Sequence, residues 1–190
     1  LFERNHLLII SWSLLNSNDN LQFNEERDRW FRYNGCMTDL ISSPANPLVK
    51  LIHSLHQKKG RQETGLFLVE GIHPVGQAVE ADWNLDTIVF APDLLTSAYA
   101  QQLVEQQTLR KVRCVAFTPQ LFTSVAGKEN PQGILALVHQ RHLAIDELNP
   151  ANFTMGVASV CPQDPGNVGT ILRTLDAVGA DGLFLLEGGV

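Results

Sequence analysis

The chain has 190 residues, which is enough for one ordinary domain or two small ones. Apolar residues make up 44% and charged residues 18%, a mixture that excludes a disordered or collagen-like chain. The net charge of -6 argues against a protein that binds nucleic acid over its whole surface. How this charge is distributed along the chain matters more than its sum.

Residues 1–36 differ in character from the residues after Met37, so we expect an N-terminal extension outside the fold. The apolar stretch at residues 7–15 lacks the flanks of a signal peptide. Three widely separated cysteines, Cys36, Cys114 and Cys161, have no metal-ligand spacing and predict a reduced, cytoplasmic chain without a metal site. No apolar run reaches the ~20 residues that cross a bilayer, so no membrane association is expected.

Basic charge is concentrated in residues 46–61. The apolar residues of 46–56 recur at helical spacing, which predicts a helix followed by a basic turn at 58–61. This segment contains no acidic residue, and its cations are Lys50, Lys58, Lys59 and Arg61. Such a patch can neutralise phosphates along an RNA backbone, while a solvated helix end is an equally good interpretation of the charges alone.

From residue 66 onward, apolar runs alternate with helix-like stretches. Strands are expected at 66–69, 85–90, 112–117 and 133–138, with helices at 74–81, 97–107 and 119–125. This alternation predicts an α/β domain over residues 37–140 with a largely parallel sheet.

A polar, irregular stretch at 141–152 predicts a linker before a second unit at 153–190. In that unit we expect a strand at 153–160, a loop at 161–166, a helix at 167–178 and a strand at 183–186. One βαβ unit cannot bury both faces of a sheet. The second domain is therefore expected to be only partial.

The densest motif is Asp-Pro-Gly-Asn-Val-Gly-Thr-Ile-Leu-Arg-Thr at residues 164–174. It predicts a tight turn that opens a helix, whose free N–H groups form a ready anion site. Asn167 and Arg173 are six residues apart and do not share a helix face, so Asn167 should reach a common site only as a cap or loop residue. An ordinary βα turn and a nucleotide-binding helix start remain alternatives, although the dinucleotide fingerprint is absent.

Two stretches together resemble the SpoU/TrmH family of RNA ribose methyltransferases, within the SPOUT class. The first comprises Ile41-Ser42-Ser43, Asn46-Pro47-Leu48-Val49-Lys50, Lys59-Gly60-Arg61 and 65–71, and resembles the start of the family's substrate-binding domain. The second, residues 164–174, resembles the first SPOUT motif. The implied fold is a small ribosomal-protein-like α/β domain followed by the first βαβ part of a trefoil-knot methyltransferase domain.

The resemblance implies methyl transfer from S-adenosylmethionine to a ribose 2′-hydroxyl of RNA, with ribosomal RNA as the expected substrate. Arg173 and Asn167 match the catalytic positions of the motif, and Arg173 should position a phosphate, because a guanidinium stays protonated. The expected RNA contacts are Asn46, Lys50, Lys58, Lys59 and Arg61. Cofactor-binding residues are expected beyond Val190, and the full-length protein is expected to be a homodimer. A non-catalytic RNA-binding module is the alternative.

Overall fold

The computed structural model describes residues 40–141, 151 and 153–186. The expectations for residues 1–36, for Cys36 and for most of the 141–152 segment fall outside these residues. The described residues belong to two compact units that divide between Gln140 and Arg141, and each unit is treated by itself. No helix within the described ranges is long and apolar enough to cross a membrane.

The first unit contains five helices and four strands in its described part. In chain order they are α2 (Pro47–Leu55), α3 (Lys58–Thr64), β1 (Leu66–Glu70), α4 (Ile72–Glu80), β2 (Leu85–Phe90), α5 (Ala98–Leu109), β3 (Arg113–Ala116), α6 (Pro119–Val125) and β4 (Ile134–His139). The expected strands and helices from 66 to 138 are present within two residues at each end. The expected basic turn at 58–61 is wrong, because these residues form the first turn of α3.

Three helices begin at the same local signal, a capping side chain followed by proline. The side chains of Asn46, Thr118 and Asp164 accept hydrogen bonds from backbone N–H groups in the first turns of α2, α6 and α7 (Pro165–Ala177). Proline at the first helical position has no N–H group to satisfy and has its φ already fixed for a helix.

The sheet of the first unit has the order β1-β4-β2-β3. Strand β4 runs antiparallel to both β1 and β2, and only β2 and β3 are parallel. The expected largely parallel sheet is therefore wrong. Helix α6 is only 7 residues long, and residues 126–133 return the chain to the end where β3 finished, so β4 has to run in the opposite direction.

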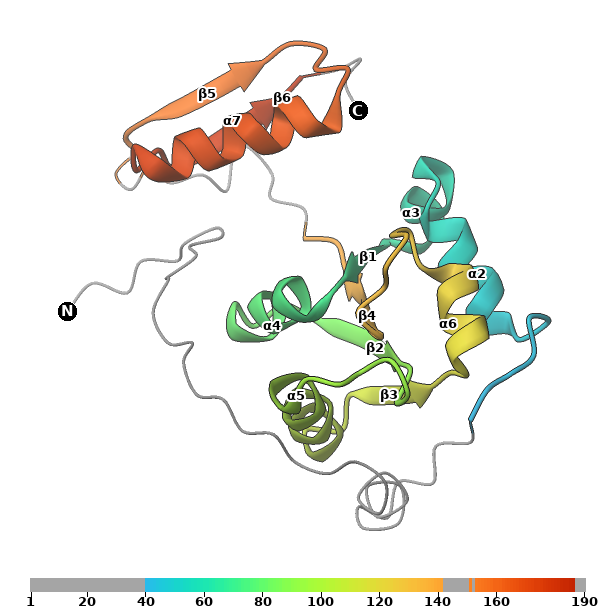
Figure 1. The fold of residues 1–190 in the computed structure, drawn as a ribbon. Helices are drawn as coiled ribbons and strands as arrows, with labels where there is room; N and C mark the ends of the chain where they lie inside the picture. The colour runs from blue at the N-terminus through green and yellow to red at the C-terminus, as the bar shows by residue number, and fades with distance from the viewer. Residues whose placement is uncertain (1–39, 142–150, 152, 187–190) are drawn as a thin grey trace. The chain divides into compact units, whose positions relative to one another are not determined.

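Helices cover both faces of this sheet (Figure 1). Side chains of α2 and α6 pack on one face and those of α4 and α5 on the other. Along β4, Leu135 and Leu137 belong to the first cluster, while Ile134, Ala136 and Val138 belong to the second. Burial on both faces explains why β4 is continuously apolar rather than alternating.

We call the end of this sheet at which β4 finishes the linker end. Strands β1, β2 and β3 begin there and β4 finishes there, because Leu66 pairs with His139 and Leu85 with Val138. The backbone N–H of Gln140 donates to the Gly65 carbonyl over 2.7 Å as the chain leaves the sheet. Helix α3 directly precedes β1, so its C-terminus also lies at the linker end.

The second unit is a parallel pair of strands joined by one helix. Strand β5 (Gly156–Ser159) pairs with β6 (Gly182–Leu185), and α7 connects them. Phe153 and Phe184 contact each other with ring centroids 5.5 Å apart. No residue of α7 is buried, and Val160 and Val178 are 71% and 60% exposed. This unit therefore has apolar side chains that its described part does not cover.

Candidate functional site

The start of α7 is organised by Asp164. Its Oδ1 accepts hydrogen bonds from the backbone N–H groups of Gly166, at 2.6 Å, and Asn167, at 3.0 Å. Asn167 lies in the first turn of the helix, so the expectation that it acts as a cap or loop residue is wrong. A residue before proline favours extended backbone, which is the conformation of an N-cap, and this assigns the cap to Asp164. Its carboxylate also occupies two of the N–H groups that an anion would need.

Arg173 extends back along α7 toward the helix start. Its Nη2 donates to Thr170 Oγ1 over 3.0 Å, and this hydroxyl donates in turn to the Gly166 carbonyl over 3.0 Å. Gly169 lies beside the guanidinium, and a Cβ there would meet Arg173 Nη1 at 3.5 Å, an ordinary van der Waals contact. Among the described residues Arg173 has no acidic partner, so its charge is available to an anionic ligand.

The two predicted catalytic residues are brought onto one helix but not into contact. No hydrogen bond joins Asn167 and Arg173 within the described part of the chain. Thr170 lies between them, one turn from each, and fixes the guanidinium. Sequence analysis missed Thr170, although its spacing of three residues before an arginine on a helix was a usable signal.

Two of the five predicted RNA-contacting residues serve the fold. Asn46 Oδ1 accepts from the Leu48 backbone N–H over 2.9 Å and so caps α2. Arg61 Nη1 donates to the carbonyls of Leu55, at 3.1 Å, and His56, at 3.2 Å. These carbonyls end α2 and have no partner within that helix, so Arg61 fastens α3 to the end of α2.

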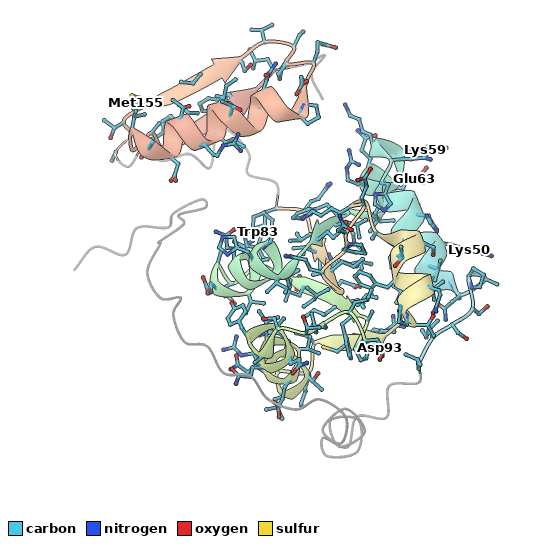
Figure 2. All side chains as sticks on the ribbon, in the orientation of Figure 1. Lys50, Lys59, Glu63, Trp83, Asp93 and Met155 are labelled. Carbon is cyan, nitrogen blue, oxygen red and sulfur yellow. The ribbon has the colours of Figure 1, made fainter. Side chains whose placement is uncertain are left out.

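The three lysines of this segment face solvent. Figure 2 shows Lys50 and Lys59 projecting outward from α2 and α3. Lys59 Nζ lies 3.8 Å from Glu63 Oε1 one turn along α3, and the two side chains are 83% and 64% exposed. An exposed pair of this kind is a weak constraint, of about 0.3–0.5 kcal/mol. Lys50, Lys58 and Lys59 are therefore placed to meet phosphates.

Gly60 explains how α3 can approach α2 closely. A Cβ at this position would collide with the Ser54 carbonyl, so only glycine fits between the two helices. The glycine in the Lys59-Gly60-Arg61 sequence thus sets the position of the cations on either side of it.

A second basic stretch escaped sequence analysis. Arg110 and Lys111 lie between α5 and β3, Arg113 is the first residue of β3, and all three are exposed. Three cations in four residues were a usable signal, but the excess of acidic residues around them concealed it. The described residues contain no group of three His, Cys, Asp or Glu side chains that could hold a metal ion.

Comparison with known proteins gives consistent matches. The model of the MRM3-like substrate binding domain matches residues 46–136. RlmP of Bacillus subtilis, a 23S rRNA guanosine 2′-O-methyltransferase, is 31% identical over 148 residues, which are 78% of this chain and 54% of RlmP. The SpoU methyltransferase AviRb of Streptomyces viridochromogenes, solved with its cofactor AdoMet, is 28% identical with a TM-score of 0.63 and covers 76% of this chain and 53% of AviRb. The chain belongs to the SpoU/TrmH family.

A further match is to the crystal structure of an rRNA methyltransferase of Sinorhizobium meliloti. This structure is 31% identical with a TM-score of 0.68, over 79% of this chain and 55% of that one. The chain spans about half the length of the curated relatives it matches. The expected fold class, a substrate-binding α/β domain followed by part of a SPOUT domain, is confirmed.

Proposed function

We propose that this SpoU/TrmH chain belongs to an RNA 2′-O-ribose methyltransferase that acts on ribosomal RNA. The observation that carries the proposal is the Arg173 guanidinium, which Thr170 holds over the start of α7 without an acidic partner in the described residues. The names of the relatives, rRNA methyltransferases with a 2′-O specificity among them, support the substrate and the reaction. We also propose a cytoplasmic homodimer for the full-length protein.

Arg173 is the residue that we assign to the reacting ribose. A guanidinium remains protonated at neutral pH, so it does not act as a base. It can hold the phosphate next to the target ribose and stabilise the negative charge that develops on the 2′-oxygen. The Thr170 hydroxyl accepts a hydrogen bond from the guanidinium and so favours this orientation. Asn167 is assigned to the same helix start, where its side chain orients the groups around the ribose.

We propose that the lysines and the two structural residues of 46–61 contribute to RNA binding differently. Lys50, Lys58 and Lys59 neutralise backbone phosphates directly. Asn46 and Arg61 act on the RNA by positioning α2 and α3, since their side chains are engaged with backbone groups.

S-adenosylmethionine is the proposed methyl donor, and it would supply the transferred methyl group. The described residues of the second unit do not fit it alone, because α7 has no buried residue and β5 and β6 form only a two-stranded sheet. No described side chain is assigned to the cofactor, and its binding residues remain predicted beyond Val190.

Methyl transfer by the full-length protein tests this proposal. Radiolabelled S-adenosylmethionine and ribosomal RNA are the substrates, and Arg173→Ala is compared with Asp176→Asn, an exposed position on the same helix. We expect Arg173→Ala to reduce kcat by about 100-fold or more while the Kd for RNA changes little. Turnover retained in Arg173→Ala would contradict the assigned role. RNA binding with no methyl transfer by the unaltered protein would favour the non-catalytic module.

A further inference from the structure

The first unit has a cleft at the linker end, on the side of the sheet that α4 and α5 cover. It lies where α4 and α5 finish and where β2 and β3 begin, and its volume is about 360 Å³. Its lining includes Trp83, Asn84, Gln107, Arg110 and Val112. Small-molecule sites have volumes of about 300–1,000 Å³, so this cleft is large enough for one nucleotide-sized group.

Gln107 gives the cleft an unsatisfied polar group. Its side chain is only 3% exposed, and its Nε2 has no hydrogen-bond partner within the described part of the chain. Its backbone carbonyl accepts from the Val112 N–H over 3.0 Å, which fixes the residue at the end of α5. Buried amides are nearly always hydrogen-bonded, so this amide is a donor suited to a ligand in the cleft that it lines.

Trp83 supplies a planar aromatic wall. The Phe67 ring meets it edge-on, with centroids 5.5 Å apart and ring planes at 74°, which fixes the indole orientation. The backbone turns sharply at Asp82, where φ is 51°, and the Trp83 N–H donates to the Ala78 carbonyl over 3.0 Å. Figure 2 shows Trp83 at the end of α4, and it is only half-buried. An unstacked base is the kind of flat group that such a side chain binds.

Positive charge lies beside the same cleft. Arg110 lines it and Lys111 follows directly, and neither cation has an ion pair among the described residues. Arg113 begins β3 on the face of the sheet that α2 and α6 cover. Asp82 also lines the cleft, but it already has a partner. An aromatic wall, a buried amide and neighbouring cations together match a nucleotide, whose base stacks and whose phosphates carry negative charge.

We propose that this cleft binds one unstacked nucleotide of a single-stranded segment of the RNA substrate. The base lies against Trp83, the Gln107 amide donates to its edge, and the flanking phosphates meet Arg110 and the adjacent Lys111. The proposal rests on the proposed function in taking RNA as the ligand. A free nucleotide has the same chemistry, and the experiment separates the two sources.

Trp83 fluorescence in the full chain tests the proposal. Trp12→Phe and Trp30→Phe leave Trp83 as the reporting tryptophan. The protein is titrated with an unstructured RNA hexamer, with the same hexamer carrying abasic sites, and with AMP or UMP. We expect the RNA to quench Trp83 and the abasic hexamer to bind about 5- to 150-fold more weakly. If a mononucleotide binds as tightly as the hexamer, the nucleotide in the cleft is a free nucleotide rather than part of an RNA strand, and the proposal is overturned.

Substitutions at Gln107 and Arg110 separate ligand binding from folding. Gln107→Leu should weaken RNA binding about 2- to 10-fold without lowering Tm, because an unpartnered buried amide is replaced by an apolar group. Gln102→Leu, at an exposed position of the same helix, should change neither quantity. Arg110→Ala should reduce the slope of log K against log salt by about 0.7. RNA affinity unchanged in Gln107→Leu and in Trp83→Leu would overturn the cleft.

The two proposals fail in different ways. If RNA binds and is methylated but does not quench Trp83, the cleft is overturned and the proposed function stands. If RNA quenches Trp83 and binding depends on Gln107 but no methyl group is transferred, the proposed function is overturned and the cleft stands.

Discussion

Removing the side chain of Arg61 should lower the thermal stability of the domain. Removing the neighbouring lysines should instead lower the salt dependence of RNA binding. Arg61 donates to the Leu55 and His56 carbonyls, one bond partly buried and the other exposed. Buried hydrogen bonds of charged groups contribute about 1.5–3 kcal/mol each, and exposure reduces this, so we expect Arg61→Ala to cost about 1–2 kcal/mol. For a domain of this size, that corresponds to a fall in Tm of about 5–15 °C.

The double substitution Lys50→Ala and Lys59→Ala should leave Tm within a few degrees, because both side chains are exposed and the ion pair of Lys59 with Glu63 contributes little. If both lysines contact phosphates, the slope of log K against log salt should fall by about 1.4, which is about 0.7 for each lost contact with a single strand. Thermal unfolding followed by circular dichroism, and RNA anisotropy measured over a series of salt concentrations, give the two quantities.

Arg61→Lys is the matched control, since it retains the charge but loses the paired hydrogen bonds to the two carbonyls. It should lower Tm nearly as much as Arg61→Ala while keeping the salt slope of the unaltered protein. The reasoning is refuted if Arg61→Ala leaves Tm unchanged and lowers the slope, since Arg61 would then be a phosphate contact rather than a fastening between helices.

Three further predictions concern single positions. Gly60→Ala should lower the free energy of unfolding by about 1–3 kcal/mol in denaturant titrations, because its Cβ collides with the Ser54 carbonyl. Asp164→Ala should cost about 0.5–2 kcal/mol of local stability and accelerate amide exchange at the start of α7. Asp164→Asn should change neither quantity much, because asparagine caps helices about as well as aspartate. Burial, and then the charge and hydrogen bond of the Glu80 carboxylate, raise the pKa of Tyr99 above its ordinary value of 10.0. The folded state therefore holds the Tyr99 proton more tightly than the unfolded state does. The stability that this contributes is present below pH 10 and should be lost as pH rises through the raised pKa. Tyr99→Phe should abolish this pH dependence of the free energy of unfolding, measured from about pH 9 to 12.

Element positions in the first unit could be predicted from the sequence, whereas strand direction could not. Apolar runs and capping signals identify β4 and α6 because they depend on residues close together in the chain. The direction of β4 depends on where residues 126–133 return the chain, and no local pattern encodes that. Alternation of strands and helices was therefore a good guide to element type and a poor one to sheet topology.

The site residues divide in a similar way. The sequence identified Arg173, but its contact with Thr170 depends on the rotamers of two side chains. Asp164 could have been identified as the cap, because an aspartate before a proline at a helix start is a strong signal. The hydrogen bonds of Arg61 were not predictable from its charge, since a basic run gives no indication of which cation folds back onto a helix end.

The net charge of -6 conceals an uneven surface on the first unit. Lys58 and Lys59 lie in the first turn of α3, whereas Arg110 and Lys111 lie just before β3 begins. Strand pairing places the beginning of β3 at the linker end, so only the second basic stretch is assigned to that end of the domain. The Trp83 cleft, which Arg110 lines, lies at the same end, where Gln140 leaves the sheet. The arrangement of the strands, rather than the total charge, therefore determines which basic residues lie beside the Trp83 cleft.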